Sequence, residues 1–483
     1  MESRQQDDIF QFEGSVTEPI VSNESDPDSE PDSDPELPEK DSVEKFGSPL
    51  DIAKADVREV GPRVYVLTGH DKEEICLDVF GCQGEEGPHQ KEVAELLNKK
   101  AAKKKADLMV VLGDNFYSDG VPSPDDPRFK SQIYDVYADK KLEHICDVPM
   151  AVILGNHDAN RYLIRSYKSA GNYALGLFPF IGSALADKYL PSKPVGEETE
   201  INQAAHTYLP REGDPQIDET YVEFFQRDQL PIKSLRKFNM PFFYYSFIIG
   251  NVQLFFLNTN NYAKHYYDSL NGTNNDPLLN QALWLKAHYD AARAAGRTVL
   301  FAQHHPLITC DKRAFAGDAY LYFDPPSYRT PPADWVALAG IFNLEVSKYS
   351  YSALLSCIYE KQGISPDLIL CAHGHYLGYI NNNLKTDQRY KIRQVISGAG
   401  GGKLMPQKDF SRGDILGLHE EKFGYVRITC NVNRPQFVHM DFYTTDDHHF
   451  EFTNEGIRPL DAPIPVEEKD PSLSTSVLKP GLF

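Results

Sequence analysis

Five apolar segments of strand length in this chain each run directly into side chains that bind metal ions. Short continuous apolar runs of this kind are typical of strands buried on both faces. In open α/β sheets, the residues just beyond the carboxyl ends of the strands meet at one edge, where ligands bind. The five segments end in Asp78, in Asp114 to Tyr117, in Asn156 to Asp158, in His304 and His305, and in His373 to His375. The sequence therefore predicts one site assembled from five strand ends.

The order of strands and helices indicates an α/β class. Strands are expected at 64–67, 75–79, 108–112, 150–154, 298–302 and 368–371, and amphipathic helices at 89–106, 129–139 and 276–295. Segment 247–257 is also apolar and of strand length. Alternation of this kind argues for layers of helix against sheet.

Composition divides the chain into three parts. Residues 1–50 hold fifteen Asp or Glu against three basic residues, which gives −12 of the total charge of −21. A segment this acidic and this poor in apolar residues is expected to be disordered, either keeping the chain soluble or binding a protein partner. A catalytic domain is expected at 56–455, with insertions at about 162–238 and 311–364, and a loose tail at 456–483.

Charge and apolar content exclude some classes of protein. The chain lacks the basic balance of a nucleic-acid binder, and no apolar run has the length of a membrane helix. No conventional secretory signal is visible, so cytoplasmic residence and export by a non-classical route both stay open. Seven cysteines without a Cys-x-x-Cys pair argue against a disulfide scaffold.

The types of candidate ligand indicate the class of metal. Carboxylates, a phenol, an amide oxygen and imidazoles form a hard-to-borderline set that suits Fe, Mn or Zn. A carboxylate bridging two cations would be central, because paired cations stabilise both the attacking and the leaving oxygen in phosphoryl transfer.

The motifs at these strand ends resemble those of the purple acid phosphatases, within the calcineurin-like metallophosphoesterase superfamily. The resemblance rests on GDNFYSDG, GNHD, HHP and HGH, and on flanking stretches close to the tartrate-resistant type. It covers roughly 75–160, 238–310 and 366–402, and it implies an α/β/β/α core in which two packed mixed sheets are flanked by helices.

The resemblance also implies a role for each candidate residue. Asp78, Asp114, Tyr117 and His375 would hold a first metal, iron in this family, and Asp114 would bridge to the second. Asp114, Asn156, His304 and His373 would hold that second metal, a divalent Fe, Zn or Mn. His157 would lie beside the leaving group, with Asp158 orienting it. Because His304 and His305 are adjacent, one of them must point elsewhere, and the family pattern favours His304 as the ligand.

The chain departs from the family at the first block. The family has Gly-Asp-Trp-Gly where this sequence has Leu-Asp-Val-Phe-Gly-Cys-Gln, with Asp78 kept as the carboxylate and Cys82 close by. The environment of the first metal is therefore in question.

The function expected is hydrolysis of phosphomonoesters by in-line attack of a metal-bound hydroxide, with His157 as general acid. A phosphodiesterase or nucleotide hydrolase of the same superfamily is the first alternative, and a catalytically dead binding scaffold is the second. The substrate is open between small phosphorylated molecules and phosphoproteins.

Overall fold

The computed structural model describes residues 57–67, 73–117, 120–159, 195–208, 234–309, 337–342 except 339, 351–381, 392–405 and 422–453. All of them belong to one compact unit, Glu44–Phe483. The predicted acidic segment 1–50, the predicted tail 456–483 and most of both predicted insertions lie outside the described residues, so the division into domains stays a prediction.

The larger of two mixed sheets has eight strands in the order β1-β2-β6-β7-β8-β9-β11-β10. Strands β7, β8, β9 and β11 run parallel, while β1, β6 and β10 each pair antiparallel with a neighbour. Its strands are β1 (Val57–Gly61), β2 (Val64–Leu67), β6 (Tyr245–Ile249), β7 (Val252–Leu257), β8 (Thr298–Gln303), β9 (Leu368–Cys371), β10 (Leu377–Asn381) and β11 (Arg393–Ser397).

The second sheet has six strands in the order β14-β13-β12-β3-β4-β5. Three of the predicted site motifs follow the strands of its parallel half, β3-β4-β5. Its antiparallel half is the meander β12-β13-β14, formed by the last described residues, and β12 pairs with β3. The strands are β3 (Glu74–Phe80), β4 (Leu108–Val111), β5 (Met150–Val152), β12 (Gly424–Asn431), β13 (Val438–Thr444) and β14 (His449–Thr453).

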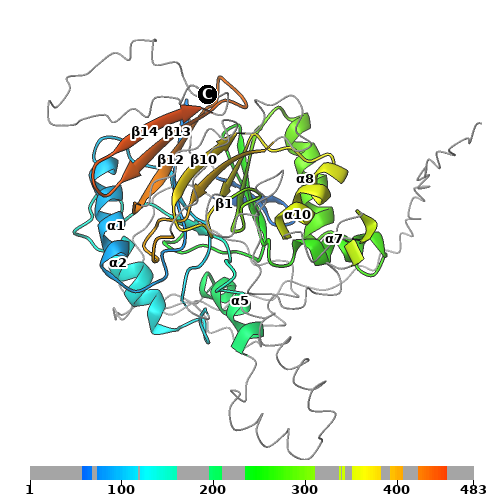
Figure 1. The fold of residues 1–483 in the computed structure, drawn as a ribbon, viewed down its shortest axis with the longest axis horizontal. Coiled ribbons are helices and arrows are strands. Elements are labelled where there is room, and N and C mark those ends of the chain that lie inside the picture. The colour runs from blue at the N-terminus through cyan, green and yellow to red at the C-terminus, as the bar shows by residue number, and fades with distance from the viewer. Residues whose placement is uncertain are drawn as a thin grey trace, which may run out of the picture. The chain divides into compact units, whose positions relative to one another are not determined.

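The sheets pack face to face and helices cover their outer faces (Figure 1). The helices α7 (Tyr262–Leu270), α8 (Gln281–Ala294) and α10 (Tyr351–Lys361) bury apolar side chains such as Trp284 and Ile358 against Phe301 of the eight-stranded sheet. On the six-stranded sheet, α1 (Pro88–Ala101) buries Val93 and Leu97, and Tyr137 of α2 (Asp135–Tyr137) stacks on Phe80. The predicted α/β/β/α architecture is confirmed.

Several predicted elements have different bounds, for local reasons. Segment 247–257 is a hairpin, because Gly250 adopts a φ of 56° between β6 and β7. The helix expected at 276–295 begins at Gln281, because the Asn280 side chain caps it by accepting from the N–H groups of Ala282 and Leu283. The helix expected at 129–139 begins as a π-helix, Phe129–Tyr134, that continues into α2. No described helix is both long enough and apolar enough to cross a membrane.

Helix α5 (Val195–His206) lies within the first predicted insertion, and it packs into the core. Gln203 is fully buried. Its amide donates to Asp158 at 2.9 Å, and its carbonyl oxygen accepts from the Asn115 side chain at 3.0 Å. This helix therefore contacts the two motif loops that carry Asn115 and Asp158, a role that the sequence pattern did not indicate.

His206, the last residue of α5, makes folding stability depend on pH. Its ring stacks on Phe129 at 3.5 Å, Nδ1 donates to the Pro124 carbonyl, and Nε2 accepts from the Tyr134 hydroxyl. Burial lowers the pKa of His206 from 6.5 to about 4. The unfolded chain thus takes up this proton near pH 6.5 and the folded chain does not. The stability tied to His206 is complete above pH 6.5 and is lost as the pH falls towards 4.

We expect this loss to reach roughly 3 kcal/mol of unfolding free energy in the wild type. Denaturant unfolding of wild type and His206→Gln at pH 7 and pH 4.5 measures it, since glutamine cannot take up the proton. The stability gap between the two proteins should be wide at pH 7 and narrow at pH 4.5. An equal gap at both pH values would contradict the assignment.

Candidate metal centre

The predicted site motifs meet where the ends of the two sheets touch. Asp114 follows β4 and Asn156 follows β5 in one sheet, whereas His304 follows β8 and His373 follows β9 in the other. His304 Nδ1 donates to the Leu112 carbonyl at 2.7 Å, which joins the two sheets directly. A side chain at Gly81 would come within 2.7 Å of the Ala372 Cβ, so the loop after β3 can approach β9 only because residue 81 is glycine.

Three residues at this junction adopt the left-handed backbone conformation without being glycine. Cys82, Asp114 and His373 have φ values of 53°, 55° and 61°. This conformation is uncommon for residues with a Cβ, and it concentrates at functional sites, where surrounding contacts enforce it. The three residues are thus held in place by their loops, each with its side chain at the junction.

The Asp114 carboxylate is shared between two groups of potential ligands. Its Oδ2 accepts from the Tyr117 hydroxyl at 2.9 Å, and its Oδ1 lies 3.4 Å from His304 Nε2 and accepts from the His157 N–H at 3.0 Å. One oxygen therefore faces each group. This is the arrangement that a carboxylate bridging two cations requires.

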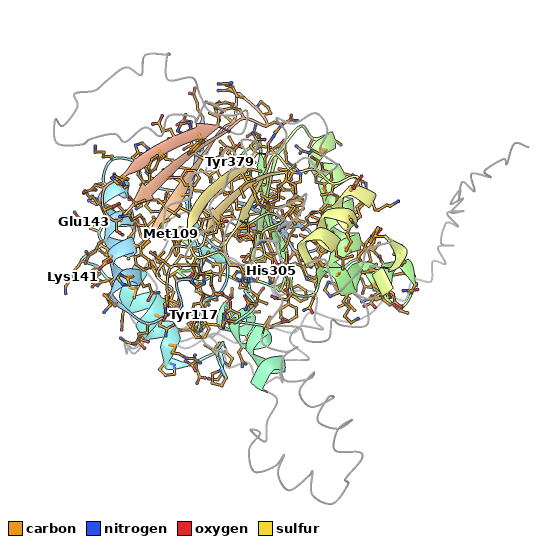
Figure 2. The ribbon with its side chains drawn as sticks, in the orientation of Figure 1. Met109, Tyr117, Lys141, Glu143, His305 and Tyr379 are labelled. Atoms are coloured by element: carbon orange, nitrogen blue, oxygen red, sulfur yellow. The ribbon has the colours of Figure 1, made fainter. Side chains whose placement is uncertain are left out.

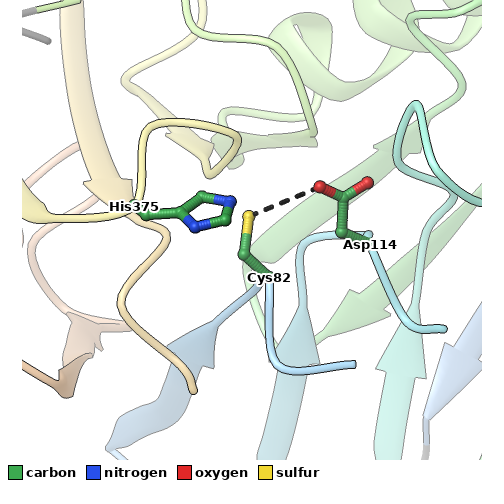
Figure 3. Close-up of side chains that lie close together, drawn as sticks. All are labelled: Cys82, Asp114 and His375. Atoms are coloured by element: carbon green, nitrogen blue, oxygen red, sulfur yellow. Dashed lines mark hydrogen bonds between the residues drawn. The ribbon is translucent and has the colours of Figure 1, made fainter. Parts of the chain in front are cut away.

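The first group consists of Cys82, Asp114, Tyr117 and His375. Figure 3 shows the Cys82 sulfur between the His375 ring and the Asp114 carboxylate, with 3.8 Å between Sγ and Oδ2. Potential ligand atoms of Cys82, Asp114 and His375 all lie within 4.8 Å of one another. His375 Nδ1 donates to the Lys403 carbonyl, so Nε2 faces the Tyr117 hydroxyl, 3.1 Å away.

The second group consists of Asp114, Asn156, His304 and His373. His304 Nε2 lies 3.0 Å from the Asn156 carbonyl oxygen and 3.0 Å from His373 Nδ1. Because Nδ1 of His304 donates to a backbone carbonyl, Nε2 is the ring nitrogen that faces the other side chains of the group. A ring nitrogen that faces two oxygen acceptors and another ring nitrogen is the arrangement expected where a cation binds.

Glycines leave room for these groups. A Cβ at Gly155 would lie 2.2 Å from Asp114 Oδ1 and 2.8 Å from the His304 ring, and a Cβ at Gly402 would lie 3.2 Å from the His375 ring. The backbone thus approaches both groups closely, and the donor types of both groups suit metal ions.

The structure does not bring Asp78 into either group, and its predicted role as a ligand stays a prediction. It lies within β3, two residues before the strand ends, directly opposite Arg427 of β12. Its carboxylate forms two hydrogen bonds with the Arg427 guanidinium, at 2.7 and 2.9 Å. Burial raises the pKa of Asp78 and the guanidinium lowers it, with burial the larger effect.

Cys82 occupies the place at the junction that was predicted for Asp78. The family block Gly-Asp-Trp-Gly has its ligand between two glycines, and Gly81-Cys82-Gln83-Gly84 keeps both of them. Both glycines are required, since a Cβ at Gly84 would lie 2.3 Å from the Asn115 carbonyl oxygen. The spacing of the two glycines is the sequence signal for Cys82 as a candidate ligand, whereas residue type alone favoured Asp78.

His157 and Asp158 lie at the mouth and at the base of the site. His157 is partly exposed, and its ring packs on Tyr117 with 4.5 Å between ring centres. Asp158 is fully buried, and its carboxylate accepts from the backbone N–H groups of Gly155, Asn115 and Phe116 and from Gln203. Asp158 therefore joins the two motif loops, where the prediction had it orient His157.

Charges at the site perturb two of the candidate ligands. Burial raises the pKa of Asp114, but His304 and His157 outweigh burial and hold the pKa well below its usual range. Burial and then the Asp114 charge raise the pKa of Tyr117 well above 10. Asp114 is therefore ionised, and a cation would be needed to ionise the Tyr117 phenol.

His305 lies beside the second group, with its ring centre 5.1 Å from those of His304 and His373. Its Nδ1 is 2.8 Å from the Thr259 hydroxyl. Figure 2 labels His305 and Tyr117, which come from the two different sheets. His304 Nε2 faces Asn156 and His373, while His305 Nδ1 faces Thr259.

Comparison with known proteins gives one broad match and several partial ones. The sequence profile described as calcineurin-like phosphoesterase matches residues 78–377. Tartrate-resistant acid phosphatase type 5 of Oryctolagus cuniculus, of Rattus norvegicus and of Homo sapiens is 45% identical over 53 residues. That match spans 11% of this chain and 15% of each relative.

Among solved structures, GAP50, the anchor in the inner membrane complex of Plasmodium, aligns with a TM-score of 0.43 and 14% identity over 80% of this chain and 90% of its own. PhoD aligns with a TM-score of 0.43 and 15% identity over 83% of this chain and 74% of its own. Because the profile match covers more than half of the sequence and includes the strand ends described above, this chain belongs to the calcineurin-like phosphoesterase family.

Proposed function

We propose that this protein is a two-metal phosphatase that hydrolyses phosphomonoesters. The observation that carries the proposal is the Asp114 carboxylate, which presents one oxygen to each of two buried ligand groups. The short match to tartrate-resistant acid phosphatases supports the monoester class over the diester class. Tyr117 supports it too, because the phenol marks the purple acid type that the sequence resembles.

The first cation would be held by Cys82, Asp114, Tyr117 and His375, and the second by Asp114, Asn156, His304 and His373. The resemblance implies iron in the first position and a divalent Fe, Zn or Mn in the second. When bound, such a pair supplies a water of lowered pKa and neutralises charge on the phosphoryl oxygens.

His157 is proposed to protonate the leaving oxygen. An imidazole suits this step because it titrates near neutral pH. The ring packs on Tyr117, the residue is partly exposed, and its backbone N–H donates to Asp114, which places His157 beside the proposed ligands.

His157→Ala is expected to lower turnover of an alkyl phosphate by about 10²–10⁴-fold, because a poor leaving group needs the proton. An aryl phosphate with an acidic leaving group should lose much less, and metal content should be unchanged. Steady-state kinetics on both substrates with metal analysis measures this, and His144→Ala, an exposed histidine outside the site, is the control.

Equal losses on the two substrates, or none, would refute the role of His157. The same assays with a phosphodiester test the alternative activity, because a diesterase would turn over the diester faster than either monoester. Protein that binds no metal would remove the proposed function as a whole.

Cys82 is proposed as a ligand in the position predicted for Asp78. A thiolate is a softer donor than a carboxylate and favours Zn or ferrous iron. Cys82→Ala is therefore expected to lose one of two bound cations, whereas Cys82→Asp, which restores the family's donor, should retain both. Asp78→Asn should also retain both.

Metal analysis of the three variants checks this prediction. Cobalt loading adds a second readout, since wild type should show a sulfur-to-cobalt charge-transfer band that Cys82→Asp lacks. Full metal content in Cys82→Ala, or a band that persists in Cys82→Asp, would rule out the sulfur as a ligand.

A further inference from the structure

A second cluster of metal-binding side chains lies on the surface of the six-stranded sheet, away from the strand ends. It consists of His439 and Asp441 on β13 and His449 and Glu451 on β14. None of the five motifs contributes to it, and the proposed function does not use it.

Strand geometry brings these four side chains to one face. Successive residues of a strand point to opposite faces, so His439 and Asp441 share a face, as do His449 and Glu451. The register places Asp441 directly opposite Glu451, and Tyr443 directly opposite His449. The alternate residues Met440 and Phe442 belong to the core between the sheets, so the cluster is on the other face.

The ligand atoms of His439, Asp441 and Glu451 lie close together, and His449 approaches Asp441 and Glu451. Asp441 Oδ1 lies 3.2 Å from His439 Nε2 and 2.9 Å from His449 Nε2, and His449 Nε2 lies 3.9 Å from Glu451 Oε1. Tetrahedral zinc with bonds of about 2.0–2.1 Å places its ligand atoms about 3.3 Å apart. Atoms of His439, Asp441 and Glu451 all fall within 4.8 Å of one another.

The cluster holds two carboxylates on neighbouring strands, Asp441 and Glu451. Two carboxylates directly opposite each other on neighbouring strands destabilise a sheet. The basic residue that pairs with Asp441 on its other side is Arg427, and its guanidinium is already bonded to Asp78. With neutral imidazoles the four side chains carry a charge of about −2, which one divalent cation balances.

The surroundings hold the ligands in place. The His449 ring stacks on Tyr443, with 4.6 Å between ring centres, and Lys100 of α1 lies 4.6 Å from the centre of the Tyr443 ring. The Asp441 side chain is only 13% exposed, while those of His449 and Glu451 are 38% exposed. Asp441 is therefore held within the cluster, while His449 and Glu451 are accessible to solvent.

We propose that His439, Asp441, His449 and Glu451 form a binding site for a divalent transition-metal ion of the zinc class. Two imidazoles with two carboxylates suit zinc better than magnesium or calcium, which prefer oxygen ligands alone. The ion joins β14, the edge strand of the six-stranded sheet, to β13. Its binding stabilises the folded chain in proportion to the logarithm of metal concentration.

The test uses the full chain, stripped of metal and titrated with zinc, with the bound zinc counted at each step. His439→Ala/His449→Ala is expected to bind one zinc ion fewer than wild type. The rise in thermal stability that zinc produces should be at least tenfold smaller in this variant than in wild type. Phosphatase activity should stay within about twofold, since the site is separate. Glu451→Gln, at an exposed position, should weaken the same site while leaving both imidazoles in place.

Two matched variants keep the test specific. His89→Ala removes a histidine that pairs with an exposed Glu92, and it should not change the zinc count. His304→Ala should lose zinc from the candidate metal centre and keep the zinc that the surface cluster binds. The proposal is overturned if the double variant and Glu451→Gln bind as much zinc as wild type with equal affinity.

Discussion

Asp114→Asn is expected to release both cations of the candidate metal centre and to lower turnover by at least about 10³-fold, a change of about 4 kcal/mol in activation free energy. Each Asp114 oxygen faces a different ligand group, so no other single substitution should affect both cations. An amide has one oxygen and no charge, and therefore cannot bridge. Metal analysis and phosphatase kinetics measure the outcome.

Asp135→Asn is the matched control, because Asp135 lies on the surface and pairs with Lys130. This variant should retain both cations and full turnover. Two cations retained in the candidate metal centre of Asp114→Asn would show that the carboxylate does not bridge, and the two-metal proposal would then fail.

Arg427→Ala is expected to lower the unfolding free energy by about 3–5 kcal/mol without changing metal content. The Asp78 carboxylate is fully buried, and removing the guanidinium leaves its charge without a partner. Because burial raises the pKa of Asp78, the variant should recover stability as the pH falls and the carboxyl takes up a proton. Denaturant unfolding at pH 7 and pH 5 checks both points.

A double replacement by apolar residues of similar size, Asp78→Leu/Arg427→Met, should be much more stable than Arg427→Ala, because no charge remains buried. Loss of a metal ion in Arg427→Ala would contradict the structural role of Asp78 and would return it to the candidate ligands.

The sequence predicted the parts of the site whose chemistry is local. Asp114, Asn156, His304 and His373 each follow an apolar run, so strand ends and residue type were sufficient to predict that they lie close together. Asp78 was predicted from its residue type, whereas its position two residues inside β3 places it opposite Arg427. Only the backbone shows that the chain turns at Cys82, four residues later.

Long-range contacts account for what the sequence did not predict. Gln203 supports the motif loops from a helix far along the chain, and no periodic pattern signals a single buried amide. The meander β12-β13-β14 was not predicted either, although Arg427 on β12 determines what Asp78 does. Predicting these contacts would have required knowing which strands are neighbours.

The junction of the two sheets also makes the spacing between them a property on which metal binding at the candidate centre would depend. His304, His373 and His375 belong to one sheet, and Cys82, Asp114, Tyr117 and Asn156 to the other, so neither ligand group is complete on one side. Bound cations would cross-link the two sheets. A slight slip of one sheet past the other, caused by a substitution deep in the shared core, would then open both ligand groups at once. Metal affinity would report on packing far from any ligand.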